Sequence, residues 1–95
     1  MAKPTESRYQ LRVSRSAAAS LAEHLPEKVA HAALEFITGS LLNNPHRVGK
    51  ALGPPLAPAF SARRGDYRIL YLIDVESRTV SVTAVKHRSD AYRSA

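Results

Sequence analysis

Two short segments in the second half of the chain concentrate the side chains that could bind and break a phosphate backbone. The first is Ser61-Ala-Arg-Arg-Gly-Asp-Tyr-Arg68, and the second is Val85-Lys-His-Arg-Ser-Asp-Ala-Tyr-Arg93. Cleavage of RNA by a ribose 2′-OH that attacks the adjacent phosphate requires a proton acceptor, a donor to the leaving 5′ oxygen, and cations over the phosphorane. Arginine supplies only the cation, because guanidinium keeps its proton near neutral pH.

Other residues of these segments would therefore have to accept and donate the protons. His87 has the unperturbed pKa best suited to proton transfer at neutral pH. Tyr92, with an ordinary pKa of about 10, would need neighbouring cations to act as a base. The competing interpretation is structural: Arg63, Arg64 and Arg88 would be solvated charges on edge strands that prevent aggregation, and Tyr92 would be a packing residue.

The sequence indicates no metal site and no other cofactor. His24 and His31 are seven residues apart, which corresponds to about 10 Å at the rise of a helix, too far to bind one ion together. We interpret both as helix-surface residues, and His46 as a structural or incidental loop residue. Signatures of phosphate-binding loops, dinucleotide-binding loops and hydrolase nucleophiles are missing from the sequence, as is any suggestive pair of carboxylates.

Positive charge is concentrated outside the predicted helices. The 95 residues carry 14 Lys and Arg against eight Asp and Glu, a formal net charge of +6. Residues 14–44 have a net charge of −1, whereas residues 63–95 have a net charge of +3. This distribution is typical of a protein whose partner is nucleic acid or an acidic protein.

Length and composition predict one cytoplasmic domain that spans residues 1–95. The hydrophobic fraction of 44% is sufficient for one core. Without cysteine there can be no disulfide or thiolate metal site, and nothing suggests an oxidising compartment. We expect no membrane segment or signal peptide, because no apolar run reaches roughly 18 residues. Residues 1–7 are polar and are expected to be flexible.

The first half of the chain is predicted to form a strand followed by a helical hairpin. Apolar and polar residues alternate over residues 9–14, the pattern of a half-buried strand. Ser14 or Ser16 can cap a helix that ends at Pro26. A second helix can begin at Pro26 and stop at Asn43-Asn44-Pro45.

The second half is predicted to contain a stiff connecting loop and three antiparallel strands. Residues 45–58 hold four prolines and two glycines, which favours a loop. Turns at Gly65-Asp66 and Glu76-Ser77-Arg78 separate the segments 59–63, 67–74 and 79–85. The predicted fold is thus α+β, in the order β-α-α-β-β-β, with the helical hairpin packed on a small, mainly antiparallel sheet.

Two packing details also follow from the sequence. Gly39 costs roughly 1 kcal/mol relative to Ala within a helix, which suggests that the second helix packs closely on a flat surface. In the middle strand Leu70 and Leu72 lie on the face opposite Tyr67 and Ile69. We therefore expect both faces of that strand to be largely covered.

Three segments together resemble the RelE/ParE toxin superfamily. Arg64-Gly65-Asp66-Tyr67-Arg68-Ile69-Leu70-Tyr71 is similar to the family's G-x-Y-R-hydrophobic-hydrophobic-Tyr signature. The loop Asn44-Pro45 to Gly49-Lys50-Ala51-Leu52 resembles Asn-Pro…Gly-Lys-Pro-Leu, and Val85 to Tyr92 resembles the His-Arg…Tyr ending. The predicted order of elements is that of the family's RelE-like fold, so the resemblance covers nearly the whole chain.

The resemblance implies the toxin of a type II toxin–antitoxin system, and RelE-type members enter the ribosomal A site and cleave mRNA. It assigns Arg68 to the transition-state phosphate, Arg88 to an assisting role, and Tyr92 to the family's C-terminal catalytic tyrosine. Lys50 and Arg63 would bind the RNA or ribosomal backbone. The remaining basic residues of the two segments extend this RNA-binding set to Lys50, Arg63, Arg64 and Lys86, beside the catalytic set Arg68, His87, Arg88 and Tyr92.

One departure from the family pattern affects the acid–base assignment. Ala59 and Ser61 occupy a strand where ribosome-dependent members can carry lysines. This gives His87 more weight as a proton-transfer group. The implied partners are an acidic, RelB-like antitoxin in a hetero-oligomer, the ribosome and mRNA.

Two other functions remain open at this point. A ParE-like protein would poison DNA gyrase and cleave nothing itself, so it would not need an acid–base pair. A degenerate toxin could persist as a binding module or a repressor partner. The presence of His87 and Tyr92 favours the endonuclease over the gyrase inhibitor.

Overall fold

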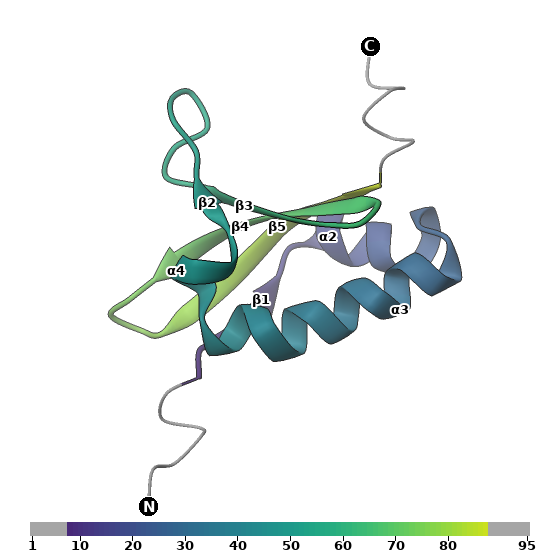
Figure 1. The fold of residues 1–95 in the computed structure, drawn as a ribbon, viewed down its shortest axis with the longest axis horizontal. Coiled ribbons are helices and arrows are strands. Elements are labelled where there is room, and N and C mark those ends of the chain that lie inside the picture. The colour runs from purple at the N-terminus through teal and green to yellow at the C-terminus, as the bar shows by residue number, and fades with distance from the viewer. Residues whose placement is uncertain (1–7, 88–95) are drawn as a thin grey trace, which may run out of the picture.

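A computed structural model describes residues 8–87 of the chain, and the expectation that residues 1–7 are flexible lies outside this range. Two helical arms lie on one side of a twisted five-stranded sheet, and the opposite side of the sheet carries no helix in the described part (Figure 1). We call the side turned away from the helices the open face. Among the described residues no helix is long and apolar enough to cross a membrane.

The helical layer is the predicted hairpin. Its first arm is α2 (Arg15–Ala19), continued by the π-helical turn η1 (Ser20–His24). Its second arm is α3 (Glu27–Phe36), continued by η2 (Ile37–Leu41). The Ser14 hydroxyl caps α2 by accepting a hydrogen bond of 3.0 Å from the Ala17 amide.

The sheet has the strand order β1-β5-β4-β3-β2. Its strands are β1 (Gln10–Val13), β2 (Lys50–Ala51), β3 (Phe60–Arg64), β4 (Tyr67–Asp74) and β5 (Thr79–His87). The pairs β2–β3, β3–β4 and β4–β5 are antiparallel, and β1 pairs with β5 in parallel. The predicted α+β class, hairpin and three-stranded meander are therefore confirmed.

The predicted connecting loop over residues 45–58 is wrong in its first half. Residues Pro45–Val48 form a short helix, α4, and Lys50–Ala51 form the edge strand β2. Proline is compatible with the first turn of a helix, where its missing N–H needs no partner. β2 escapes recognition by periodicity because two residues are too few to show an alternation.

The hydrophobic core lies between the helical layer and the facing side of the sheet. The helices contribute fully buried Ala17, Ala33, Ile37 and Leu41, and the strands contribute Ile69, Tyr71, Val80 and Val82, each 0% exposed. On the open face, in contrast, Leu72 is 37% exposed and Arg68 is exposed. The expectation that β4 is covered on both sides is therefore wrong, because the described chain contains only one helical layer.

Close packing of a glycine occurs at Gly49 and not at Gly39. A Cβ atom built on Gly39 would meet no atom within 4 Å, so that prediction is wrong. At Gly49 the same atom would collide with the Tyr71 hydroxyl and would lie 2.8 Å from the Ser61 carbonyl oxygen. The backbone between α4 and β2 thus passes directly over the Tyr71 side chain.

We expect Gly49→Ala to destabilise the fold by about 1–3 kcal/mol, the usual cost of overpacking. The added methyl group would displace the Tyr71 hydroxyl from its hydrogen bond with the Pro45 carbonyl oxygen, which measures 2.7 Å. Urea denaturation checks the prediction. The matched control is Gly39→Ala, which should be neutral or stabilising because its Cβ meets open space and alanine favours the helix.

Candidate nucleic-acid interface

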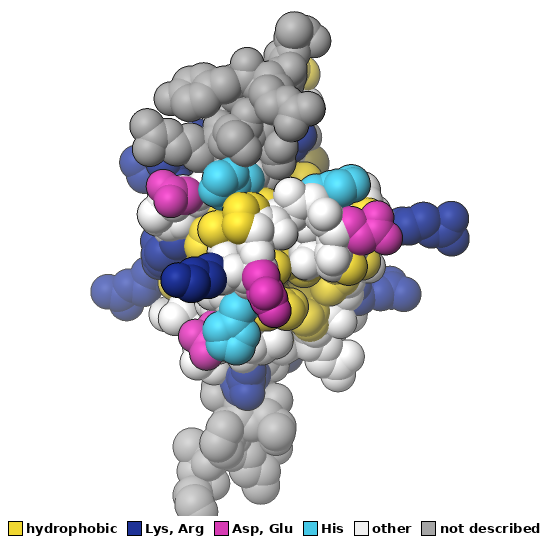
Figure 2. Space-filling model, turned by 90° about the vertical axis from the view of Figure 1, so that its right-hand side faces the viewer, with side chains coloured by type: hydrophobic (Ala, Val, Ile, Leu, Met, Phe, Trp, Pro, Cys, Tyr) yellow, Lys and Arg dark blue, Asp and Glu magenta, His cyan; other side chains and the backbone are white. Residues whose placement is uncertain are grey.

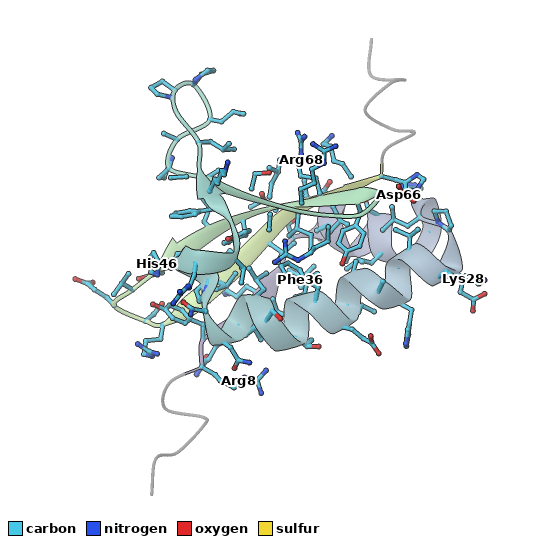
Figure 3. The ribbon with its side chains drawn as sticks, viewed as in Figure 1. Arg8, Lys28, Phe36, His46, Asp66 and Arg68 are labelled. Carbon is cyan, nitrogen blue, oxygen red and sulfur yellow. The ribbon has the colours of Figure 1, made fainter. Side chains whose placement is uncertain are left out.

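Three cationic residues form a straight row across the open face. Arg63 of β3 is paired with Arg68 of β4, and Arg68 is paired with Lys86 of β5. All three are exposed. The Arg68 side chain points away from the helices (Figure 3). Residues directly opposite one another on adjacent strands have Cβ atoms about 4.5–5.5 Å apart, so the three charges share one site. We call this set the cationic row.

The cationic row is unfavourable for the isolated protein. Like charges placed directly opposite on a sheet are destabilising by roughly 0.2–1 kcal/mol per pair. Within residues 8–87 no ion pair or side-chain hydrogen bond of Arg63, Arg68 or Lys86 offsets this repulsion. A bound polyanion would remove the repulsion and release counterions, which is the usual origin of affinity for a nucleic-acid backbone.

Lys50 flanks the row on the same face. Its partner in the sheet is Ser61, two residues from Arg63 on β3. Diagonal neighbours of this kind are about 7–8 Å apart, within reach of a long side chain. The sheet therefore brings Lys50, Arg63, Arg68 and Lys86 together, as expected for a phosphate-binding surface.

Arg64 and His87 belong to the opposite face of the sheet. Both are paired with Tyr67, so they alternate with the members of the cationic row. The Arg64 guanidinium stacks over the Phe36 ring at 4.6 Å from its centroid, and this contact ties β3 to α3. His87 is half-buried at the end of β5. Neither side chain shares a face with Arg68. The alternation of faces along a strand is the sequence signal that could have separated Arg64 from Arg63, and His87 from Lys86.

Arg88 and Tyr92 lie outside the described residues 8–87. Their roles stay predictions. Arg88 follows directly on His87, the last residue of β5.

A hollow of about 370 Å³ lies on the helix side of the β3–β4 turn. It is lined by Lys28, Val29 and Ala32 of α3 and by the turn residues Arg64 to Tyr67. The Tyr67 hydroxyl donates a hydrogen bond of 3.2 Å to the Ala32 carbonyl oxygen. This bond and the Arg64–Phe36 contact fix the turn that starts β4, and so they position Arg68.

The two tyrosines of β4 act as hydrogen-bond donors. Burial raises the pKa of Tyr67, with a smaller lowering by the Arg64 charge. Burial also raises the pKa of Tyr71 to about 12, again with a smaller opposing effect of Arg64. Both hydroxyls therefore stay protonated at neutral pH, and neither is suited to the role of a general base.

The end of the molecule where the two helical arms meet has a different character. Figure 2 shows acidic and histidine side chains among apolar ones on this end, with Lys and Arg projecting from its flanks. His31 lies 3.3 Å from Glu35 one helical turn away, on the exposed side of α3. In the described part of the chain no three His, Asp or Glu side chains are close enough to hold one metal ion.

Comparison with known proteins places this architecture among the bacterial toxins. Residues 11–92 match the family model described as the ParE toxin of the type II toxin–antitoxin system parDE. The chain is 47% identical over 85 residues to the toxin RelE of Mycobacterium tuberculosis, which covers 90% of this chain and 87% of that protein. It is 52% identical over 69 residues to the toxin RelG of the same organism, covering 73% and 79% respectively.

A solved structure agrees with these sequence matches. The crystal structure of the toxin–antitoxin complex RelBE2 from M. tuberculosis contains a chain with 46% identity to this one and a TM-score of 0.82. The match covers 85% of this chain and 99% of that chain.

Proposed function

This chain belongs to the RelE/ParE family of type II toxin–antitoxin toxins, and we propose that it is a ribosome-dependent endoribonuclease that cuts mRNA in the A site. The observation that carries the proposal is the cationic row. Its three charges lie side by side on an exposed face that carries no helix within residues 8–87, and an extended RNA backbone would have access to them there. A cytoplasmic location follows from a ribosomal target.

In the proposed reaction a ribose 2′-OH attacks the adjacent phosphorus and the bond to the 5′ oxygen breaks. The products are a cyclic phosphate and a free 5′-OH. Arg68, in the middle of the row, would carry the charge that develops on the phosphorane oxygens. Arg63 and Lys86 on either side, together with Lys50, would hold the neighbouring phosphates.

Proton transfer is proposed for His87 and Tyr92, with Arg88 as an assisting cation. Histidine is the side-chain type best suited to proton transfer at neutral pH, which makes His87 the first candidate. Because His87 faces the helix side at the end of β5, it would act from the rim of the open face.

Translation with purified ribosomes tests the proposal. We expect the message to be cut at A-site codons when ribosomes are present, and the same message without ribosomes to stay intact. Primer extension maps the cuts. Uncut message in the translating reaction would contradict the endonuclease.

A gyrase inhibitor is the second candidate, and the description of the matching family as the ParE toxin of parDE favours it. Such a protein would use the basic face for binding alone. Intact message together with accumulating gyrase–DNA cleavage complexes would support this alternative. The two functions are thus separated by one pair of assays on the same purified toxin.

The partner that we propose is an acidic antitoxin of the RelB kind, assembled with the toxin in a hetero-oligomer. The M. tuberculosis relative with 46% identity was solved in a toxin–antitoxin complex. An acidic chain over the cationic row would neutralise the repulsion between its members and exclude RNA from the same surface. Inhibition would then be direct competition for Arg68 and its neighbours.

A further inference from the structure

The connection between β2 and β3 forms an ordered arm that stands apart from the rest of the protein. The Leu52 amide donates a 2.9 Å hydrogen bond to the Ala59 carbonyl oxygen and closes the base of the arm. Inside it, the amides of Leu56 and Ala57 donate to the Gly53 carbonyl oxygen, and the Ala59 amide donates to Leu56. The arm is residues 52–59, and these internal bonds define its shape.

The arm exposes apolar side chains without any polar ones. From residue 51 to residue 60 the sequence reads Ala-Leu-Gly-Pro-Pro-Leu-Ala-Pro-Ala-Phe. Residues 53–58 are all exposed, and Leu56 at the centre is 58% exposed. An exposed apolar segment of this kind on a small soluble protein is typical of a contact site.

The arm rises on the same side of the sheet as Arg68. In Figure 1 it projects from β2 and β3 away from the helices, and in Figure 3 the Arg68 side chain points in that direction as well. Phe60, at the foot of the arm, lies three residues before Arg63 on β3. At ~3.3 Å per residue the arm and the cationic row are therefore about 10 Å apart along the strand.

Between the arm and the row, the open face carries Ser61 of β3 and its partner Lys50 of β2, and next to them lie apolar side chains of β4 and β5. Leu70 of β4 pairs with Ala84 of β5, one step from the row, and the exposed Leu72 follows one step further. Along β4 the open face thus changes from cationic at Arg68 to apolar at Leu70 and Leu72, and the apolar arm rises from the neighbouring edge of the sheet. Three turns of α-helix, about 16 Å long, would span this surface.

We propose that the arm and the open face together form a docking surface for an acidic, amphipathic segment of the antitoxin, with Leu56 as its apolar anchor. The inference rests on the proposed toxin function and adds the site at which the partner is recognised. Acidic side chains of the segment would lie over Arg68 and Lys86, and its apolar side chains would pack on Leu72 and Leu56. RNA fits the arm poorly, because the arm offers it no cation, no aromatic ring and no side-chain hydrogen bond.

Leu56→Ser tests the proposal in the full-length toxin. The probe is the purified protein encoded by the small open reading frame next to the toxin gene, and calorimetry gives its affinity. We expect the affinity to fall about 10- to 100-fold, the effect of losing one buried leucine at an interface. Leu34→Ser is the matched control, because Leu34 is 44% exposed but lies on α3 in the helical layer; it should leave the affinity unchanged.

Activity assays separate this inference from the proposed function. Leu56→Ser should cleave ribosome-bound message like the unchanged toxin, yet require more antitoxin for inhibition. Loss of cleavage with unchanged antitoxin affinity would assign the arm to the ribosome and overturn the proposal. Unchanged affinity and activity would overturn it too, as would a toxin dimer that Leu56→Ser dissociates in sedimentation experiments. If the unchanged toxin cleaves no message at all, the affinity comparison still decides the role of the arm.

Discussion

Arg68→Ala is expected to reduce A-site cleavage by about 100-fold or more, comparable to the loss of one oxyanion-stabilising contact. Arg68 is the middle residue of the cationic row, paired with Arg63 on one side and Lys86 on the other. Its loss would remove the charge closest to the phosphorane while the flanking cations continue to bind the substrate. Single-turnover cleavage of ribosome-bound message measures the effect on the chemical step.

Two further variants control for charge and for position. Arg68→Lys keeps the charge but loses the planar fork that binds two phosphate oxygens, so it should recover only part of the rate. Arg15→Ala removes an exposed arginine from α2, in the helical layer, and should leave cleavage unchanged. Full activity of Arg68→Ala would exclude Arg68 from the reaction, and equal losses for Arg68→Ala and Arg15→Ala would indicate an effect of net charge alone.

Tyr71→Ala should destabilise the fold by about 3–5 kcal/mol, the usual range for truncation of a buried aromatic residue. Tyr71 is 0% exposed, stacks on Phe60 with ring centroids 5.6 Å apart, and donates a hydrogen bond to the Pro45 carbonyl oxygen. Small domains are stable by only about 5–15 kcal/mol in total, so much of the stability would be lost. Urea and thermal denaturation of the free toxin measure the change.

Tyr71→Phe separates the hydroxyl from the ring. It keeps the buried ring but leaves the Pro45 carbonyl oxygen without its partner, at an expected cost of about 1–3 kcal/mol. Equal destabilisation by the two variants would mean that the hydrogen bond, and not the packing of the ring, is the main contribution of Tyr71.

The sequence was informative about the fold where local patterns extend over enough residues. The alternation in β4, the Ser14 cap and the turn at Gly65, whose φ is +55°, all predicted the correct elements. It failed where tertiary contacts decide the structure. β2 exists only because Lys50 and Ala51 pair with β3, and the close passage at Gly49 depends on Tyr71, a residue distant in the chain.

For the candidate site, the sequence identified the types of residue but not their grouping. Arg63, Arg64 and Arg68 are close in sequence, yet only Arg63 and Arg68 share the open face, because a β-turn lies between β3 and β4. The alternation of faces along β3 would have assigned Arg64 to the face opposite Arg63. The pairing of Lys86 with Arg68, in contrast, depends on the register of β4 and β5, which a single sequence does not specify.

The position of β5 has a consequence for folding during synthesis on the ribosome. Although it is the last of the strands within residues 8–87, it lies inside the sheet, between β1 and β4. During synthesis β1 and the two helices of the hairpin emerge first, before the central strands on which they pack. Residues 79–87 complete the sheet, and with Lys86 they also supply the last cation of the row. A growing polypeptide therefore lacks the complete cationic row until nearly all of the described domain has left the ribosome. The surface that we propose to act on ribosome-bound mRNA thus forms only when synthesis of this domain is nearly finished.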